Sequence, residues 1–351
     1  MSAEPAFDPN SASTPDSGIF GLPCLEKDAA LVYVPAPWEA TVSYGGGTAG
    51  APAAVLRASR QVDLYDGDVE KPYAAGLFLR RADQKIRSLN ARARAAARKI
   101  IAAGGAQGRE SLQKHAALVN ALGAELNDSV RKSVETVLAA GKIPAVLGGD
   151  HSVPYGAFRA AAATHGTFGL LHFDAHHDMR AAYEGFRWSH ASIMRNALDD
   201  IPGIAKIVQV GIRDFCEEEA DYAASLGDRA GVFYDEALRR RMFAGEPWDE
   251  IVRDVVSGLP EKVWITFDID GLDPALCPHT GTPVPGGLSF PEANRILREV
   301  AASKRTIIGF DLVEVSPPPR GQGDWDANVG ARLLYKLTAW ALASRGLAKI
   351  R

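Results

Sequence analysis

Three apolar runs of this sequence end in clusters of acidic and histidine residues instead of ordinary turn residues. The clusters are Asp150-His151, Asp174-Ala175-His176-His177-Asp178 and Asp268-Ile269-Asp270. Short apolar runs of this kind suit the buried strands of a parallel sheet. Ligands of open α/β sheets bind beyond the carboxyl ends of the strands, so we expect the three clusters to converge on one crevice.

The spacing within each cluster indicates which side chains face that crevice. Side chains of an extended segment alternate between its two faces, so Asp174, His176 and Asp178 are predicted to point one way and His177 the other. The same period of two aligns Asp268 with Asp270.

With His151 added, the predicted set holds four carboxylates and two imidazoles. Its members are His151, Asp174, His176, Asp178, Asp268 and Asp270. Such a set is too negative to be buried together without cations. Two divalent ions that share bridging carboxylates would roughly cancel the charge, so the pattern predicts a dinuclear metal site.

Each motif alone also has an ordinary structural explanation. A histidine after a glycine pair is more often a turn residue than a ligand, and an isolated Asp-x-Asp is usually a loop. Their joint occurrence at strand ends favours the metal site. The remaining histidines of interest are assigned structural roles; these are His115, His165, His172 and His279.

Six apolar runs separated by longer helical patterns predict the strands that position these clusters. The runs cover residues 30–34, 143–147, 168–173, 207–212, 263–267 and 307–313. This alternation is typical of a three-layer α/β/α fold with a mainly parallel sheet. Three helices are also predicted, over 110–140 with a break near Asn127 and Asp128, over 80–103, and from the capping box at Ser289 to about residue 302.

The length of 351 residues and the 46% of apolar side chains allow a large core. Residues 26–351 are expected to form a single domain, because no linker follows residue 25. Residues 1–25 are rich in Ser, Pro, Ala and Asp without periodicity. They are predicted to form a flexible N-terminal tail, or an arm that lies on a neighbouring subunit.

Charge and cysteine content exclude several classes of partner. A net charge of −4 from 39 basic and 43 acidic residues provides no basic stripe for nucleic acid or a membrane surface. The three cysteines are far apart and suggest neither a disulfide framework nor a structural zinc site, which favours a reducing compartment. The N-terminus lacks the features of a signal peptide. We therefore expect a cytoplasmic protein.

Beyond these patterns, the sequence from about Pro35 onward resembles the ureohydrolase family of arginase and agmatinase. The resemblance rests on GGDHS (148–152), FDAHHDMR (173–180), SHASIMRNA (189–197), TFDIDGLDPALCPHTGTPVPGGLSF (266–290) and GFDLVEVSP (309–317). It implies an arginase-like fold and places the family's six metal ligands on the six residues selected above. It also implies a homo-oligomer, either a trimer or a hexamer.

The resemblance further implies hydrolysis of a guanidino compound to urea and an amine. Two divalent ions lower the pKa of a bridging water, which becomes the nucleophile. The family's substrate glutamate falls on Glu314, and its proton-relay histidine falls on His190. Asp178 is the predicted proton donor to the leaving amine. Mn²⁺ suits an oxygen-rich, thiolate-free ligand set, and Ni²⁺ is the alternative because nickel-dependent relatives exist.

The loop over residues 179–189 lacks the arginase pattern, which disfavours arginine as the substrate. Agmatine is the leading candidate, and Glu184, the only acid in the loop, is predicted to bind its distal ammonium. Free guanidine, N-alkylguanidines, biguanides and guanidino acids remain open, with an aromatic wall as the selecting feature. The wall would come from Trp38, Tyr44, Tyr183, Phe186 and Trp188.

Two other functions are open. An amide hydrolase of the deacetylase type shares the fold, but it keeps one metal, so the full set of six ligands argues against it. A catalytically silent partner subunit of a hetero-oligomer is disfavoured by the intact ligands, Glu314 and His190.

Overall fold

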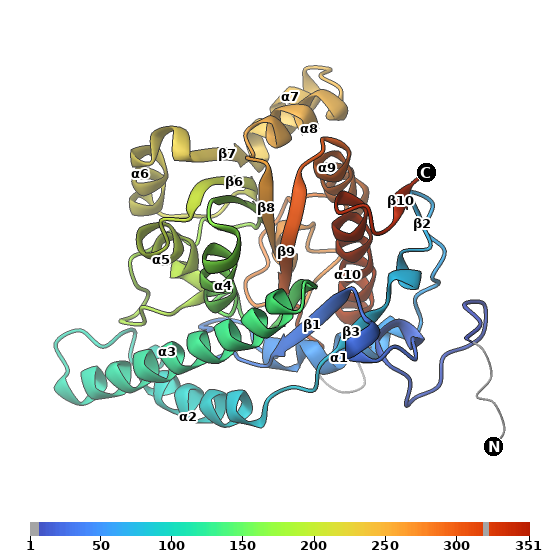
Figure 1. The fold of residues 1–351 in the computed structure, drawn as a ribbon. Coiled ribbons are helices and arrows are strands. Elements are labelled where there is room, and N and C mark those ends of the chain that lie inside the picture. The colour runs from blue at the N-terminus through green and yellow to red at the C-terminus, as the bar shows by residue number, and fades with distance from the viewer. Residues whose placement is uncertain (1–6, 319–322) are drawn as a thin grey trace.

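An eight-stranded sheet forms the centre of the molecule in the computed structural model, which describes residues 7–318 and 323–351 (Figure 1). The strands are parallel and lie in the order β3-β1-β4-β9-β8-β5-β6-β7. Their bounds are β1 (Leu31–Ala36), β3 (Leu77–Leu79), β4 (Ile143–Gly148), β5 (Phe168–Phe173), β6 (Ile204–Ile212), β7 (Ala230–Tyr234), β8 (Lys262–Asp268) and β9 (Thr306–Val313). A separate antiparallel ladder joins β2 (Val69–Glu70) to β10 (Lys349–Ile350).

Helices cover both faces of the sheet, which confirms the predicted three-layer α/β/α fold. One face carries α1 (Ala51–Ser59), α7 (Asp235–Phe243), α8 (Trp248–Ser257), α9 (Phe290–Ala302) and α10 (Trp325–Ser344). The other carries α2 (Gln84–Ile101), α3 (Glu110–Ala139), α4 (Tyr155–His165), α5 (Ile193–Asp200) and α6 (Glu217–Ser225). The two layers of apolar side chains between helices and sheet form the main hydrophobic core.

The six predicted strands correspond to β1, β4, β5, β6, β8 and β9, with ends that differ by at most three residues. The prediction missed β3 and β7, which are the two edge strands of the sheet. β3 has three residues, and the side chains of β7 are only partly buried. Edge strands need less apolar sequence than central ones, so their signal is weaker.

The predicted break in the long helix is wrong, because α3 continues through Asn127 and Asp128. Asp128 pairs with Arg131 at 2.5 Å and with Lys132 at 2.7 Å, and such pairs one turn apart stabilise a helix. Asn127 is buried where α3 packs on α4. The two helices approach so closely there that a Cβ added to Gly156 would lie 2.1 Å from the Asn127 carbonyl oxygen. Tertiary packing therefore overrides the low helix propensity of both residues.

One local signal was confirmed. The Ser289 hydroxyl accepts from the Glu292 N–H and caps α9, as the capping box predicted. The expected domain boundary near residue 25 stays a prediction, although Ile19 and Phe20 are already buried in the core. Within the described ranges, no helix has both the length and the apolar character needed to cross a bilayer.

Candidate metal centre

The three polar clusters follow β4, β5 and β8, which lie close together in the sheet with β9 between β4 and β8. Their carboxyl ends therefore meet at one edge. Gly149 allows the segment after β1 to approach this edge, because a Cβ at that position would lie 1.7 Å from the carbonyl oxygen of Trp38.

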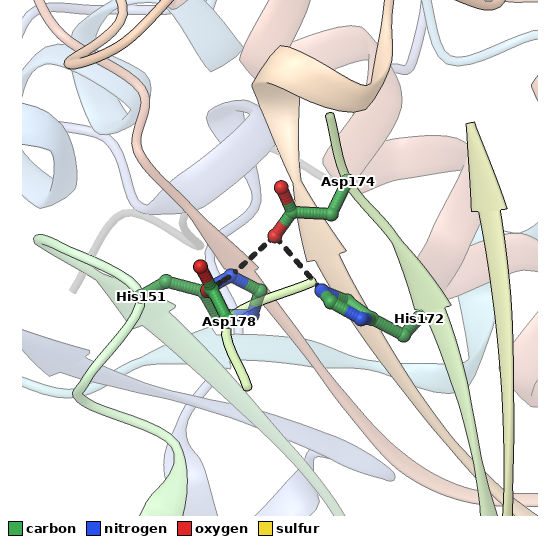
Figure 2. A group of neighbouring side chains, drawn as sticks. All are labelled: His151, His172, Asp174 and Asp178. Carbon is green, nitrogen blue, oxygen red and sulfur yellow. Dashed lines mark hydrogen bonds and ion pairs between the residues drawn. The ribbon is translucent and has the colours of Figure 1, made fainter. Parts of the chain in front are cut away.

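His151 faces three carboxylates on one side of the site. Its Nδ1 lies 2.9 Å from Asp174 Oδ2, 3.0 Å from Asp178 Oδ2 and 3.4 Å from Asp268 Oδ2. All four side chains are buried. Figure 2 shows His151, Asp174 and Asp178 directed at a common point.

A second group shares Asp174 with the first. His176 Nδ1 lies 3.3 Å from Asp174 Oδ1 and 3.2 Å from Asp270 Oδ2, and Asp268 Oδ1 accepts the Asp270 N–H at 2.8 Å. The two oxygens of Asp174 therefore face different groups, as in a carboxylate that bridges two cations. The structure brings all six predicted residues together in one cluster.

The electrostatics of this cluster require positive charge. Burial and repulsion from Asp174 raise the pKa of Asp178 to about 7. Burial, Asp270 and Asp174 raise the pKa of Asp268 well above its usual value. Burial opposes a charge on His151, but its hydrogen bonds to the carboxylates outweigh burial and raise its pKa well above normal. A set of oxygen-rich donors that cannot all ionise alone fits two divalent cations.

The second ring nitrogen of His151 is held by a buried network. Trp264 Nε1 donates to Asp311 Oδ2 at 2.7 Å, and the Thr266 hydroxyl donates to Asp311 Oδ1 at 2.8 Å. The Thr266 oxygen is then free to accept from His151 Nε2, 2.9 Å away. This arrangement keeps Nδ1 available as a ligand atom, and outer partners of this kind fix the orientation of metal-binding histidines.

His177 points away from the cluster, as predicted, and its Nδ1 donates to Gln209 Oε1 at 2.6 Å. The physical reason is not simple strand alternation, because β5 ends at Phe173 and Asp178 has a φ of +55°. Such a left-handed backbone is uncommon for a residue with a side chain, and it turns the Asp178 carboxylate toward His151.

Glu314 lies directly after β9 and also has a left-handed backbone, with a φ of +59°. Its Oε1 accepts the His151 backbone N–H at 3.0 Å. Its Oε2 is buried and has no hydrogen-bond partner among the described residues. Burial, with repulsion from Asp268 and Asp150, raises the pKa of Glu314 well above its usual value. A cationic donor beside Oε2 would satisfy this oxygen.

A cavity of about 220 Å³ opens onto the cluster. Its wall includes Ser43, His176, Asp178, Tyr183, His190 and Asp214. The Nδ1 of His190 lies 3.3 Å from Ser189 Oγ and 3.4 Å from Thr41 Oγ1. Ser189 also caps the short helical turn that His190 begins, so the structural role of Ser189 and the site position of His190 coexist. Burial and the charges of His176 and His151 lower the pKa of His190 to about 4.

The predicted specificity residue Glu184 is not brought to this cavity. It lines a separate cavity of about 790 Å³ together with the 103–109 loop and α3. Of the aromatic residues expected near the site, Tyr183 lines the wall, whereas Trp38 and Phe186 are fully buried elsewhere. Tyr44 is 84% exposed.

Asp214 and Phe215, which line the cavity just after β6, were not predicted from the sequence. A signal was available, because 207–212 was predicted as a strand. The rule that placed the other clusters at strand ends also applies to the residues that follow this strand.

Comparison with known protein families matches residues 29–339 to the arginase family, and the chain belongs to that family. The N(1)-aminopropylagmatine ureohydrolase of Synechocystis is 33% identical over 316 residues, which cover 89% of this chain and 89% of that protein. The guanidinobutyrase of Pseudomonas aeruginosa is 36% identical over 211 residues, which cover 59% of this chain and 63% of that protein.

Solved structures share the fold. The agmatine ureohydrolase of Thermoplasma volcanium superimposes with a TM-score of 0.68 and 24% identity, covering 91% of this chain and 92% of that one. The arginase from Bacillus caldovelox superimposes with a TM-score of 0.58 and 21% identity, covering 88% of this chain and 98% of that one. The expected arginase-like architecture is thus confirmed.

Proposed function

We propose that this protein hydrolyses a guanidino compound to urea and an amine, using two divalent metal ions. The observation that carries the proposal is the position of Asp174, whose two oxygens face two separate groups of ligand atoms. Relatives named as ureohydrolases and guanidinobutyrase support the same reaction class. The ions, when bound, supply an activated water as nucleophile and neutralise the carboxylates.

The residues in and around the cluster have distinct proposed roles. Glu314 Oε2 accepts hydrogen bonds from the guanidinium and holds its carbon over the cluster. Asp178 lies between the cluster and the cavity, and it carries a proton to the leaving amine. Burial and the nearby charges lower the pKa of His190 to about 4, so its ring is neutral near pH 7 and can relay a proton to solvent without retaining it.

The identity of the ions is proposed to be Mn²⁺, with Ni²⁺ as the alternative. The six candidate ligands provide carboxylate oxygens and two imidazoles and no thiolate, which suits Mn²⁺. A trimer or hexamer and a cytoplasmic location also stay predictions.

Urea release is the direct test of the proposed function. The purified protein should hold close to two divalent ions per chain and release urea from a guanidino substrate, and chelation should remove both properties. The assay covers agmatine, guanidinobutyrate, guanidine and alkylated guanidines, each with Mn²⁺ and Ni²⁺. A single ion with full activity would exclude the dinuclear site. Two bound ions without urea release from any compound would favour the silent-subunit alternative.

For the substrate, we propose a compound with a distal ammonium, of which agmatine is the leading example. Asp214 is exposed at the cavity mouth and forms no ion pair among the described residues. It can pair with an ammonium at the end of a substrate whose guanidinium contacts Glu314. Tyr183 and Phe215 provide aromatic surface on the same cavity and would select an alkylated guanidine instead.

Asp214→Asn is expected to raise KM for agmatine about fivefold to tenfold and to leave guanidine hydrolysis nearly unchanged. The lost contact is a charged pair that solvent partly screens. Glu184→Gln is the matched control, since Glu184 lines the other cavity, and steady-state kinetics compare the two variants. A larger effect of Glu184→Gln than of Asp214→Asn would assign the ammonium to Glu184. Efficient hydrolysis of dimethylated guanidines by a wild-type enzyme that ignores agmatine would instead assign selection to the aromatic surface.

His190→Ala is expected to lower kcat by roughly 10-fold to 100-fold while metal content stays normal, which is the usual scale for a positioned acid or base. The pH dependence of kcat and the metal content of the variant are measured together. His115→Ala removes a histidine that contacts Lys99 outside the site and serves as the control. Kinetics that match the wild type across neutral pH would remove His190 from the mechanism.

A further inference from the structure

A buried chain of hydrogen bonds leads away from Asp174, and the roles described above do not use it. His172 Nε2 lies 2.8 Å from Asp174 Oδ2, and Gln209 Nε2 lies 2.8 Å from His172 Nδ1. Gln209 Oε1 contacts His177 Nδ1 at 2.6 Å, and His177 Nε2 is 3.4 Å from the Tyr234 hydroxyl. The side chains of His172, Gln209 and His177 are fully buried beneath the site.

The His177 carbonyl oxygen determines which atoms donate and which accept in these hydrogen bonds. The Nε2 of Gln209 also lies 3.0 Å from the carbonyl oxygen of His177, which can only accept. This atom is therefore the amide nitrogen, and its second N–H is donated to His172 Nδ1. Because that ring nitrogen accepts, the proton of the neutral His172 ring sits on Nε2 and is donated to Asp174.

We propose that His172 is a positioning residue that holds Asp174, the carboxylate shared by the two ligand groups, in the orientation that metal binding would need, and that Gln209 fixes the tautomer of His172. The inference rests on the proposed function, since it takes the cluster to be a metal centre. Figure 2 shows His172 directed at the Asp174 oxygen that also contacts His151. A nitrogen that donates its proton has no lone pair for a cation, so His172 acts on Asp174 and not on the ion.

The position of Asp174 between the two ligand groups explains why the buried chain of hydrogen bonds should affect metal affinity. Its Oδ2 accepts from His172, while its Oδ1 faces His176 and accepts the His176 backbone N–H at 2.6 Å. Rotation of the carboxylate would therefore disturb both groups at once. Loss of an outer partner that orients a ligand typically costs 10-fold to 100-fold in metal affinity.

Two variants of similar size separate the donated hydrogen bond from simple packing. His172→Leu fills the space but has no donor, and it should weaken Mn²⁺ binding about 10-fold to 100-fold. His172→Gln keeps an N–H near the position of Nε2 and should restore most of the affinity. Gln209→Leu leaves His172 in place but removes the hydrogen bond that fixes its tautomer, so it should also weaken Mn²⁺ binding. Affinity is measured on the full chain by competition with a chelator of known Mn²⁺ affinity.

Thr338→Val is the matched control, because it removes a buried hydrogen bond with Tyr33 outside the site. It should lower thermal stability without changing Mn²⁺ affinity. Nitrogen-15 NMR of the metal-free wild type provides a second readout, with His172 protonated on Nε2 and His177 on Nδ1.

Wild-type affinity in His172→Leu would overturn the proposal, as would equal losses in His172→Leu and His172→Gln, or the opposite tautomer of His172. If the wild type binds no Mn²⁺ or Ni²⁺, the proposed function itself fails, and that result is distinct from the others.

Discussion

Asp268→Ala is expected to lower kcat/KM by more than about 100-fold and to leave fewer than two ions per chain. Losing an outer partner of a metal ligand costs up to about 100-fold. Losing a ligand itself should cost more, so the estimate of about 100-fold is a lower limit. Asp268 Oδ2 faces His151, and its Oδ1 accepts the Asp270 N–H, so one substitution disturbs both ligand groups. Metal analysis and urea release are measured on the same preparation.

Asp268→Asn separates the charge from the shape, because the amide keeps an oxygen for the Asp270 N–H. It should retain the fold and still lose metal. Asp63→Ala removes an exposed acid outside the cluster and is expected to leave both properties unchanged. Two bound ions and normal turnover in Asp268→Ala would contradict the assignment of Asp268 as a ligand.

Glu314→Gln is expected to lower kcat/KM by about 100-fold or more through both KM and kcat, since a buried charge loses its partner. The His151 N–H holds an acceptor at the position of Oε1, so the glutamine oxygen must remain there. Its NH₂ group then points to the position of Oε2, where it faces the guanidinium with another donor. The variant thus replaces an attraction with a repulsion, and steady-state kinetics measure the result.

Metal content should stay normal in Glu314→Gln, which distinguishes this effect from that at Asp268. Glu299→Gln changes the same group in a surface ion pair with Arg295 and is the control. If neither KM nor kcat moves in Glu314→Gln, the substrate role of Glu314 is wrong.

The sequence was sufficient for the central part of the fold and for the six clustered residues. Central parallel strands need continuous apolar runs, and their carboxyl ends must meet, so polar residues such as Asp174 and Asp268 could be placed together without coordinates. Strand alternation could also have predicted the position of His172. The alternation that grouped Asp174 with His176 also places His172 on the face of Asp174.

The position of Glu184 could not be predicted in this way. It lies in a loop rather than at a strand end, and its backbone has a left-handed φ of +53°. The direction of the Glu184 side chain depends on how that loop packs on α3 and the 103–109 loop. Such tertiary packing leaves no periodic pattern in the sequence. The low propensity of Asn127 for helix failed as a predictor for the same reason, because packing against α4 decides the conformation there.

The strand order also separates parts of the molecule that can change independently. The carboxyl ends of β4, β5, β8 and β9, neighbours at the centre of the sheet, and the loops that follow them supply the clustered ligand residues and Glu314. The loops after the flanking strands β1 and β6 supply wall residues of the cavity, among them Ser43, Asp214 and Phe215. Substitutions in these outer loops can alter selectivity while the ligands keep their geometry. This division provides a physical route by which a family can diverge in substrate while it keeps its ligand residues. Two relatives, each about one-third identical to this chain, carry different names, an N(1)-aminopropylagmatine ureohydrolase and a guanidinobutyrase.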